Sequence, residues 1–161
     1  MKRLPLSIVL TVFALLLLVG GVFAAQMNFR GHMSGDEIVP LQVDSQAQGQ
    51  ALFKLSEDGQ SISYKLNVAN IDHVFMAHIH KFAGVGQNGP IIVWLYPSPT
   101  PAPGAPTGRV DGTLVKGTFG PDDLVGGFTW DQLVEMLRSG DTYVNVHTSE
   151  NPAGEINGLL H

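Results

Sequence analysis

The 161-residue chain contains no cysteine, and this absence limits both how it is stabilised and what chemistry it can perform. No disulfide can cross-link the fold, no thiolate can bind a metal or act as a nucleophile, and no cysteine can carry a lipid anchor. The length suits one domain better than two. The fold must therefore be stabilised by the packing of a single core.

Clusters of basic residues are also missing from the sequence. Two of the nine Lys and Arg residues, Lys2 and Arg3, lie at the N-terminus, whereas all 14 acidic residues follow position 24, so the remainder has a formal charge of −7. An acidic chain without a run of Lys or Arg argues against nucleic acid or an anionic membrane as a partner. The negative charge is compatible with cation binding, although it also serves solubility.

Motifs for nucleophilic catalysis or dinucleotide binding are not found. Ser34, Thr148 and Ser149 lack a nucleophile elbow. Residues 84–89 match the pattern GxGxxG, but Pro90 and then β-branched and aromatic residues follow where a phosphate-binding helix would have to begin. We interpret these glycines as loop residues.

The first 24 residues have the layout of a secretory signal peptide. Lys2 and Arg3 precede an almost wholly apolar run over residues 4–25, which ends in small residues. We expect cleavage after Ala24, so that residues 25–161 form the mature domain and are secreted or held in the cell envelope. The alternative is an uncleaved anchor, because the run exceeds the roughly 18 residues of a transmembrane candidate. Membrane contact is expected only through this segment.

Short segments after Met27 alternate apolar and polar residues and are separated by turn signals. Residues 51–55 and 62–68 form a hairpin pattern around a turn at 57–60. Further strands are expected at 74–80, 91–96, 108–119, 143–148 and 155–160. The proline-rich segment 97–107 can form neither a helix nor a strand ladder, so we predict an exposed loop there. This pattern predicts an all-β antiparallel sandwich or barrel.

One short helix is predicted, beginning at Thr129. Thr129 and Gln132 fit a capping box, Leu133 and Leu137 share a helical face, and Gly140 can end the helix. We expect this helix to cover one end of the β-structure.

Three histidines form the most informative pattern in the chain. In an extended segment His78 and His80 project from the same face, because side chains alternate. His147, in the predicted strand 143–148, projects away from the valines on its own strand. If the two strands are neighbours, three neutral imidazoles form a facial set suited to copper or zinc. Histidines on a solvated sheet face can also simply hydrogen-bond to loops.

Other candidate residues are placed less clearly by the sequence. His73 is either a fourth ligand or supporting group, or an exposed loop histidine. His32 has the same alternatives, and His161 is expected to be exposed at the terminus. Glu150 and Glu155 flank a turn after His147, where either can orient a histidine or simply hydrogen-bond within the loop.

Three parts of the chain together resemble the CHRD domain, the module named after chordin. They are residues 33–40 (MSGDEIVP), residues 77–80 (AHIH) with 88–90 (NGP), and residues 143–148 (YVNVHT) continuing through 151–158 (NPAGEING). The resemblance spans about residues 27–160. Lys81-Phe82-Ala83 departs from the family's usual Gly-Pro-Ala, and the proline-rich loop is an insertion. Neither departure includes a histidine.

This resemblance implies an exported protein with an antiparallel Greek-key sandwich or barrel, immunoglobulin-like or similar to copper-zinc superoxide dismutase. In that enzyme a His-x-His strand and one histidine from a late strand hold copper. The resemblance therefore implies that His78, His80 and His147 are copper-type ligands. The enzyme's bridging histidine, zinc loop and cysteines have no counterparts here, which implies binding rather than catalysis.

The sequence thus predicts an extracytoplasmic binding module with a three-histidine site for copper or zinc. The alternative is a structural or interaction module without metal that binds an extracellular or cell-surface protein. A third reading is a copper-only enzyme similar to superoxide dismutase, which requires an open coordination position and a supporting acid or fourth ligand.

Overall fold

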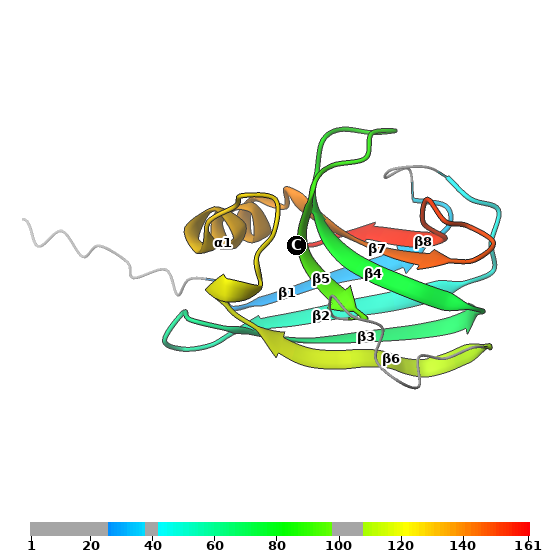
Figure 1. The fold of residues 1–161 in the computed structure, drawn as a ribbon, viewed down its shortest axis with the longest axis horizontal. Coiled ribbons are helices and arrows are strands. Elements are labelled where there is room, and N and C mark those ends of the chain that lie inside the picture. Colours follow the sequence, from blue (N-terminus) through cyan, green and yellow to red (C-terminus); the bar gives the residue numbers. More distant parts are fainter. Residues whose placement is uncertain (1–25, 38–41, 98–107) are drawn as a thin grey trace, which may run out of the picture.

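A computed structural model describes residues 26–37, 42–97 and 108–161, and within these ranges it is all-β with one α-helix. The strands are β1 (Asn28–Ser34), β2 (Gln48–Leu55), β3 (Ile62–Ile71), β4 (Val74–Lys81), β5 (Ile91–Tyr96), β6 (Val110–Phe119), β7 (Thr142–Thr148) and β8 (Ile156–Leu159). A 3₁₀ turn, η1 (Pro121–Asp123), precedes the helix α1 (Trp130–Ser139) (Figure 1). The predicted signal peptide and nearly all of the predicted proline-rich loop lie outside the described residues.

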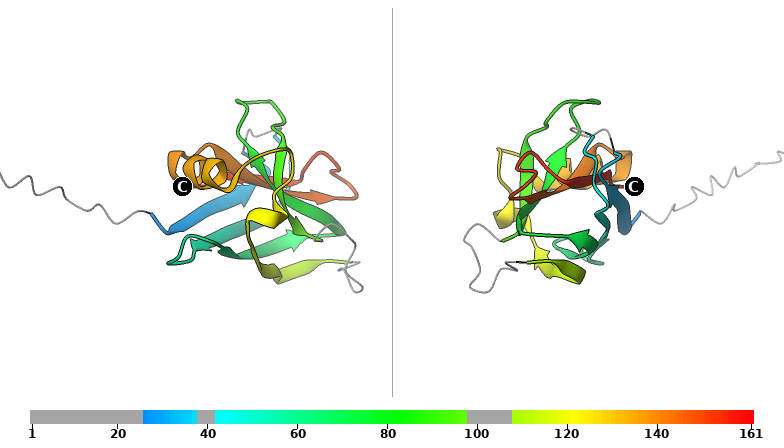
Figure 2. Two further views of the ribbon diagram at one scale, coloured as in Figure 1. Left: turned by 60° about the vertical axis from the view of Figure 1, so that its left-hand side comes forward. Right: turned by 90° about the vertical axis from the view of Figure 1, so that its right-hand side faces the viewer.

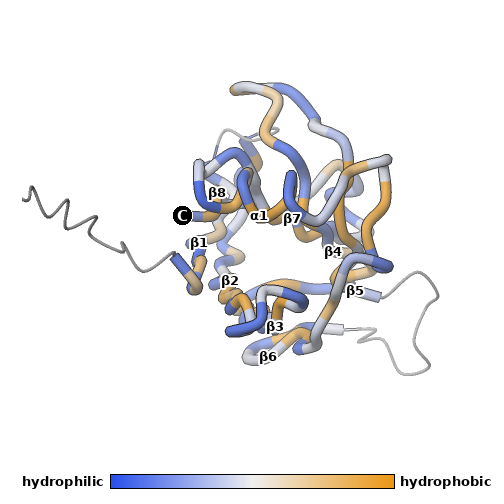
Figure 3. The backbone as a smooth tube through the Cα atoms, turned by 90° about the vertical axis from the view of Figure 1, so that its left-hand side faces the viewer, coloured by the Kyte–Doolittle hydropathy of each residue, from blue (hydrophilic) through white to orange (hydrophobic). Residues whose placement is uncertain are grey.

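All eight strands belong to one antiparallel sheet with the order β5-β4-β7-β8-β1-β2-β3-β6. The sheet curls into a nearly closed barrel, so that the edge strands β5 and β6 approach each other without pairing (Figures 2 and 3). The paired strands β4 and β7 are not consecutive in sequence, and neither are β3 and β6, so crossover connections separate the members of each pair. The predicted fold class, an all-β antiparallel barrel with one short helix, is confirmed.

The strands form where the sequence alternates, because every second side chain can then enter one core. In β2 the buried side chains are Ala51, Phe53 and Leu55, and the residues between them are exposed. The predicted hairpin with β3 is confirmed. The hydroxyl oxygen of Ser56 closes its turn by accepting hydrogen bonds from the backbone N–H groups of Gln60 and Ser61.

The helix α1 has the predicted caps. The Thr129 hydroxyl accepts from the Gln132 backbone N–H at 3.3 Å, the Gln132 amide oxygen accepts from the Thr129 N–H at 2.9 Å, and Gly140 ends the helix with φ of 78°. Leu133 and Leu137 are fully buried in the core. The helix lies at one end of the barrel (Figure 1), as expected.

We predict that Leu137→Ala lowers the free energy of unfolding by about 2–5 kcal/mol, because the change removes a fully buried side chain and leaves a cavity. Glu135→Ala, on the exposed face of the same helix, should stay within about 0.5 kcal/mol of the unmodified protein. Urea denaturation followed by circular dichroism measures both. Equal losses for the two variants would show that α1 does not contribute to the core.

Candidate metal centre

The site is built on the pairing of β4 with β7. In this antiparallel ladder Ala77 lies opposite Val146, and Ile79 lies opposite Val144. All four side chains are fully buried in the barrel core. The residues between them therefore project from the outer face of the same two strands.

The three predicted histidines meet on that outer face. His78 lies opposite Asn145, His80 lies opposite Tyr143, and Met76 lies opposite His147. The ring centroid of His78 is 4.9 Å from that of His147 and 5.4 Å from that of His80. One nitrogen from each of the three rings lies within 4.8 Å of the other two. The prediction that these histidines converge is confirmed.

The three histidines are buried rather than on a solvated sheet face, and two of them make hydrogen bonds to loop backbone, as the alternative interpretation expected. His78 is 1% exposed, and His80 and His147 are each 6% exposed. The Trp94 ring on β5 meets the His78 ring edge-on, with 4.2 Å between the ring centroids. The Tyr143 ring stacks on the His80 ring, with 4.9 Å between their centroids. Loop backbone completes the enclosure, because segments after β4 and β7 fold back over the rings.

Two backbone carbonyls fix the tautomers of two of the three rings. The Nδ1 of His80 is 2.8 Å from the Gly89 carbonyl oxygen, and the Nδ1 of His147 is 3.0 Å from the Pro152 carbonyl oxygen. A carbonyl oxygen can only accept, so Nδ1 carries the proton in each neutral ring. The lone pair is then on Nε2. Metal-binding histidines are oriented by the same kind of contact.

The remaining ring nitrogens have no hydrogen-bond partner within the described part of the chain. They are Nε2 of His80, Nε2 of His147 and both nitrogens of His78. A buried polar group left without a partner costs about 1–3 kcal/mol. A metal ion bound by one nitrogen from each ring would satisfy three of the four, so the residues present fit such an ion.

The electrostatics of the cluster keep the rings neutral. Burial, followed by the proximity of His147 and His80, lowers the pKa of His78 from 6.5 to about 3. Burial also lowers the pKa values of His80 and His147, although their hydrogen bonds to carbonyls partly oppose this effect. Neutral imidazoles are the form that binds metals, so the site needs no deprotonation at neutral pH.

Two glycines allow the covering loops to approach the strands. A Cβ at Gly89 would lie 1.7 Å from the carbonyl oxygen of Lys81, and the Gly89 N–H donates to the Tyr143 hydroxyl at 3.2 Å. Gly154 has φ of 120°, and a Cβ there would lie 2.1 Å from Oδ1 of Asn145. Larger residues would push the loops, and with them the two carbonyl acceptors, away from the histidines.

The other candidate histidines do not join the cluster. His73 is exposed in the turn between β3 and β4 with φ of 50°, and His32 is exposed on the outer face of β1. His161 is exposed, as predicted. Neither His73 nor His32 belongs to the group of residues close enough to share an ion.

The two candidate carboxylates do not orient a histidine. Glu155 is buried, but its oxygens accept from the hydroxyls of Ser45 at 2.7 Å and Thr148 at 2.6 Å. Glu150 is exposed. Sequence reasoning instead missed the carbonyls of Gly89 and Pro152. Both residues belong to segments that resemble the CHRD domain, NGP (88–90) and NPAG (151–154). The glycine and proline residues of these segments were the signal that a loop approaches the strands closely.

Three neutral imidazole nitrogens are ligands suited to zinc and copper ions. Such a set would supply three nitrogen ligands to a bound ion. In the described ranges, no helix has the length and apolar character needed to cross a membrane.

The fold and the cluster define a small antiparallel β-barrel domain with a buried group of three histidines. The chain belongs to the CHRD-domain family, whose model matches residues 29–160. Comparisons with curated proteins and with solved structures give no match. The family predicted from the three segments is thereby confirmed.

We predict that acid destabilises the metal-free protein through these histidines. Their folded-state pKa values lie below the unfolded value of 6.5, so the unfolded state binds more protons as the pH falls through that value. The free energy of unfolding should therefore decrease from pH 6.5 toward the His78 pKa of about 3 and be insensitive to these groups well above 6.5. Urea midpoints measured across this range test the slope.

Matched variants identify the origin of this pH dependence. His78→Gln should reduce the slope, because one buried base is removed, whereas His32→Gln on the exposed face of β1 should retain it. A slope unchanged in His78→Gln would contradict the assignment.

We also predict that Gly89→Ala destabilises the fold, because its methyl group would overlap the Lys81 carbonyl. The expected loss is about 1–3 kcal/mol in the free energy of unfolding, as for other overpacked sites. Gly108→Ala is the control, since a Cβ there meets no atom of the described residues within 4 Å. Thermal unfolding measures both, and equal stability of the two variants would argue against a tightly packed loop.

Proposed function

We propose that this protein is an extracytoplasmic binding module that holds one copper or zinc ion through His78, His80 and His147. The observation that carries the proposal is the convergence of three buried histidines, with one ring nitrogen from each within 4.8 Å of the other two. Within the described ranges, four of the six ring nitrogens also have no hydrogen-bond partner. Histidines with only a structural role would be expected to use both ring nitrogens in hydrogen bonds. Here the hydrogen bonds satisfy Nδ1 of His80 and of His147. Within the described ranges, their Nε2 atoms and both nitrogens of His78 have no partner.

The chemistry of the ligand set narrows the metal to two candidates. Zinc and copper both bind imidazole, and a set of nitrogen ligands binds Cu²⁺ more tightly than Zn²⁺. The resemblance to the copper ligands of superoxide dismutase favours the same ion. We therefore expect copper to bind more tightly and zinc to compete where copper is scarce.

A binding role agrees best with the surroundings of the site. The rings are nearly closed to solvent, and each flanking carboxylate lies outside the cluster or is engaged with hydroxyl groups. Turnover needs access for a substrate to the open coordination position. The function we infer is capture or storage of the ion, without redox turnover.

The extracytoplasmic location rests on two observations. The first 24 residues have the charge and hydropathy of a secretory signal, and CHRD domains are modules of an extracellular type.

The lack of cysteine also leaves imidazole as the main transition-metal ligand in the chain.

The test is metal binding by the purified protein after treatment with a chelator. Titration with Cu²⁺ and, separately, Zn²⁺ should give one ion per chain and raise the melting temperature, because the ion binds only the folded state. His147→Gln should weaken binding by about a hundredfold or more, since one of three ligands is lost. Isothermal titration calorimetry and elemental analysis measure these changes.

The matched control is His73→Gln, which removes an exposed histidine outside the cluster. This variant should bind the ion as the unmodified protein does. Equal weakening of the two variants would indicate adventitious binding. Full binding by His147→Gln, or no binding by the unmodified protein, would refute the proposal and favour an interaction module without metal.

A further inference from the structure

The sheet formed by β1, β2, β3 and β6 carries a distinctive distribution of charge. Four of the seven basic residues that follow position 24 lie on these strands, and all four are exposed: Arg30, Lys54, Lys65 and Lys116. The same strands contain one acidic residue, Asp111, which lies near the start of β6 and pairs with Arg109 at 2.8 Å. A chain that is acidic as a whole thus gathers cations on one face.

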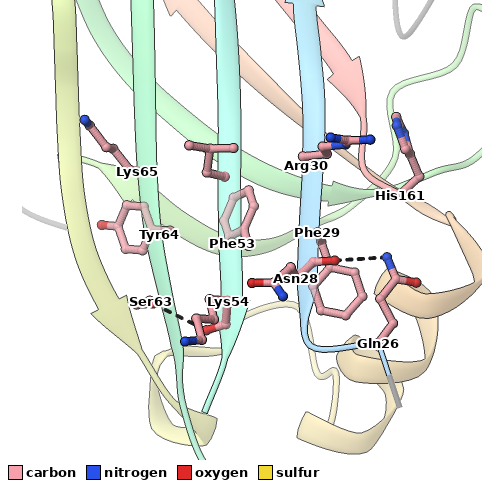
Figure 4. A pocket seen from close by; sticks show the side chains of 11 residues that line it. Gln26, Asn28, Phe29, Arg30, Phe53, Lys54, Ser63, Tyr64, Lys65 and His161 are labelled. Atoms are coloured by element: carbon pink, nitrogen blue, oxygen red, sulfur yellow. Dashed lines mark hydrogen bonds between the residues drawn. The ribbon is translucent and has the colours of Figure 1, made fainter. Parts of the chain in front are cut away.

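Strand register aligns three of these cations in one row. Arg30 lies opposite Leu52, Leu52 lies opposite Lys65, and Lys65 lies opposite Lys116. Neighbouring strands are about 4.8 Å apart, so the row extends about 14 Å across the sheet. Arg30, Lys54 and Lys65 line an open hollow of about 620 Å³ on this face. Figure 4 shows their side chains around it.

The facing pair Lys65 and Lys116 is unfavourable for the isolated protein. Like charges directly opposite on neighbouring strands repel each other, because their Cβ atoms are about 5 Å apart. Within the described ranges none of the four cations of the face forms a salt bridge. The face therefore has the charge complementary to an anionic partner.

The rows of side chains on either side of this central row are polar, and one of them includes a cation, Lys54. On one side lie His32, Gln50, Asn67 and Thr113, and on the other lie Asn28, Lys54, Ser63 and Thr118. Amide and hydroxyl groups both donate and accept hydrogen bonds, as sugar hydroxyls do. Among large apolar side chains on this face only Leu52 is exposed, at 36%, which leaves little surface to insert into a membrane.

We propose that this basic face, defined by Arg30, Lys54, Lys65 and Lys116, binds an acidic polysaccharide. Carboxylate groups along the polymer would contact the central row of cations, and the sugar hydroxyls would contact the flanking amides and hydroxyls. This surface is separate from the histidine cluster, which lies on β4 and β7, and it does not depend on a bound metal.

The test uses metal-free protein and alginate, a linear polymer of uronic acids, with neutral dextran as the comparison. The protein should bind alginate but not dextran, and added salt should weaken binding because the contacts are ionic. The double variant Lys65→Gln/Lys116→Gln should lose affinity by about tenfold or more, since two charge-assisted contacts are removed. Affinity is measured by biolayer interferometry on immobilised alginate.

The matched control is Lys81→Gln/Arg138→Gln, which changes the net charge equally on β4 and α1. Its affinity should stay within about twofold of the unmodified protein, because these cations lie outside the face. Equal losses for the two double variants would overturn the proposal, since binding would then depend on net charge alone. Absence of alginate binding, or binding to phosphatidylglycerol vesicles in its place, would also overturn it.

Two further variants separate this inference from folding and from the metal proposal. Lys116→Glu should raise the melting temperature, because it places opposite charges on facing residues, while it lowers the affinity for alginate. His147→Gln should bind alginate like the unmodified protein. A Lys116→Glu variant that retains full affinity would contradict the assigned face.

Discussion

The antiparallel pairing of β4 with β7 determines both the core and the candidate metal centre of this protein. On the inner side of the pair, Ala77 and Ile79 pack against valines of β7, and on the outer side the histidines converge. Both outcomes follow from one register, because side chains alternate with a period of two residues. A slip of one residue would move the aliphatic side chains outward and the imidazoles into the core.

The polar side chains on the outer face of this pair are buried, as core side chains are. The carbonyls of Gly89 and Pro152 accept from two of the rings, and aromatic rings enclose the cluster from the sides. The enclosure removes the imidazoles from water and so lowers their pKa values, which keeps their lone pairs available. Among the described residues, four of the ring nitrogens are also left without a hydrogen-bond partner, which costs stability in the absence of a ligand. The feature that destabilises the metal-free protein is thus the feature that suits it to an ion.

The barrel uses its two outer faces differently. Loops cover the face of β4 and β7, so its polar groups are buried. The strands β1, β2, β3 and β6 leave their outer face exposed, and there the basic residues align without acidic partners among the described residues. One small core thus supports both the candidate metal centre and the surface proposed to bind polysaccharide, on separate strands.

The sequence determined the features that depend on neighbouring residues. Alternation predicted the strands, the capping box from Thr129 to Gln132 predicted the helix, and His78 and His80 were assigned to one face because they are two residues apart. Only the tertiary structure decided that His147 lies beside them, that backbone carbonyls orient the rings, and that His73 lies elsewhere. It also aligned Arg30, Lys65 and Lys116, which are far apart in the chain. Strand order and burial depend on contacts between distant segments, and local periodicity carries no information about those contacts.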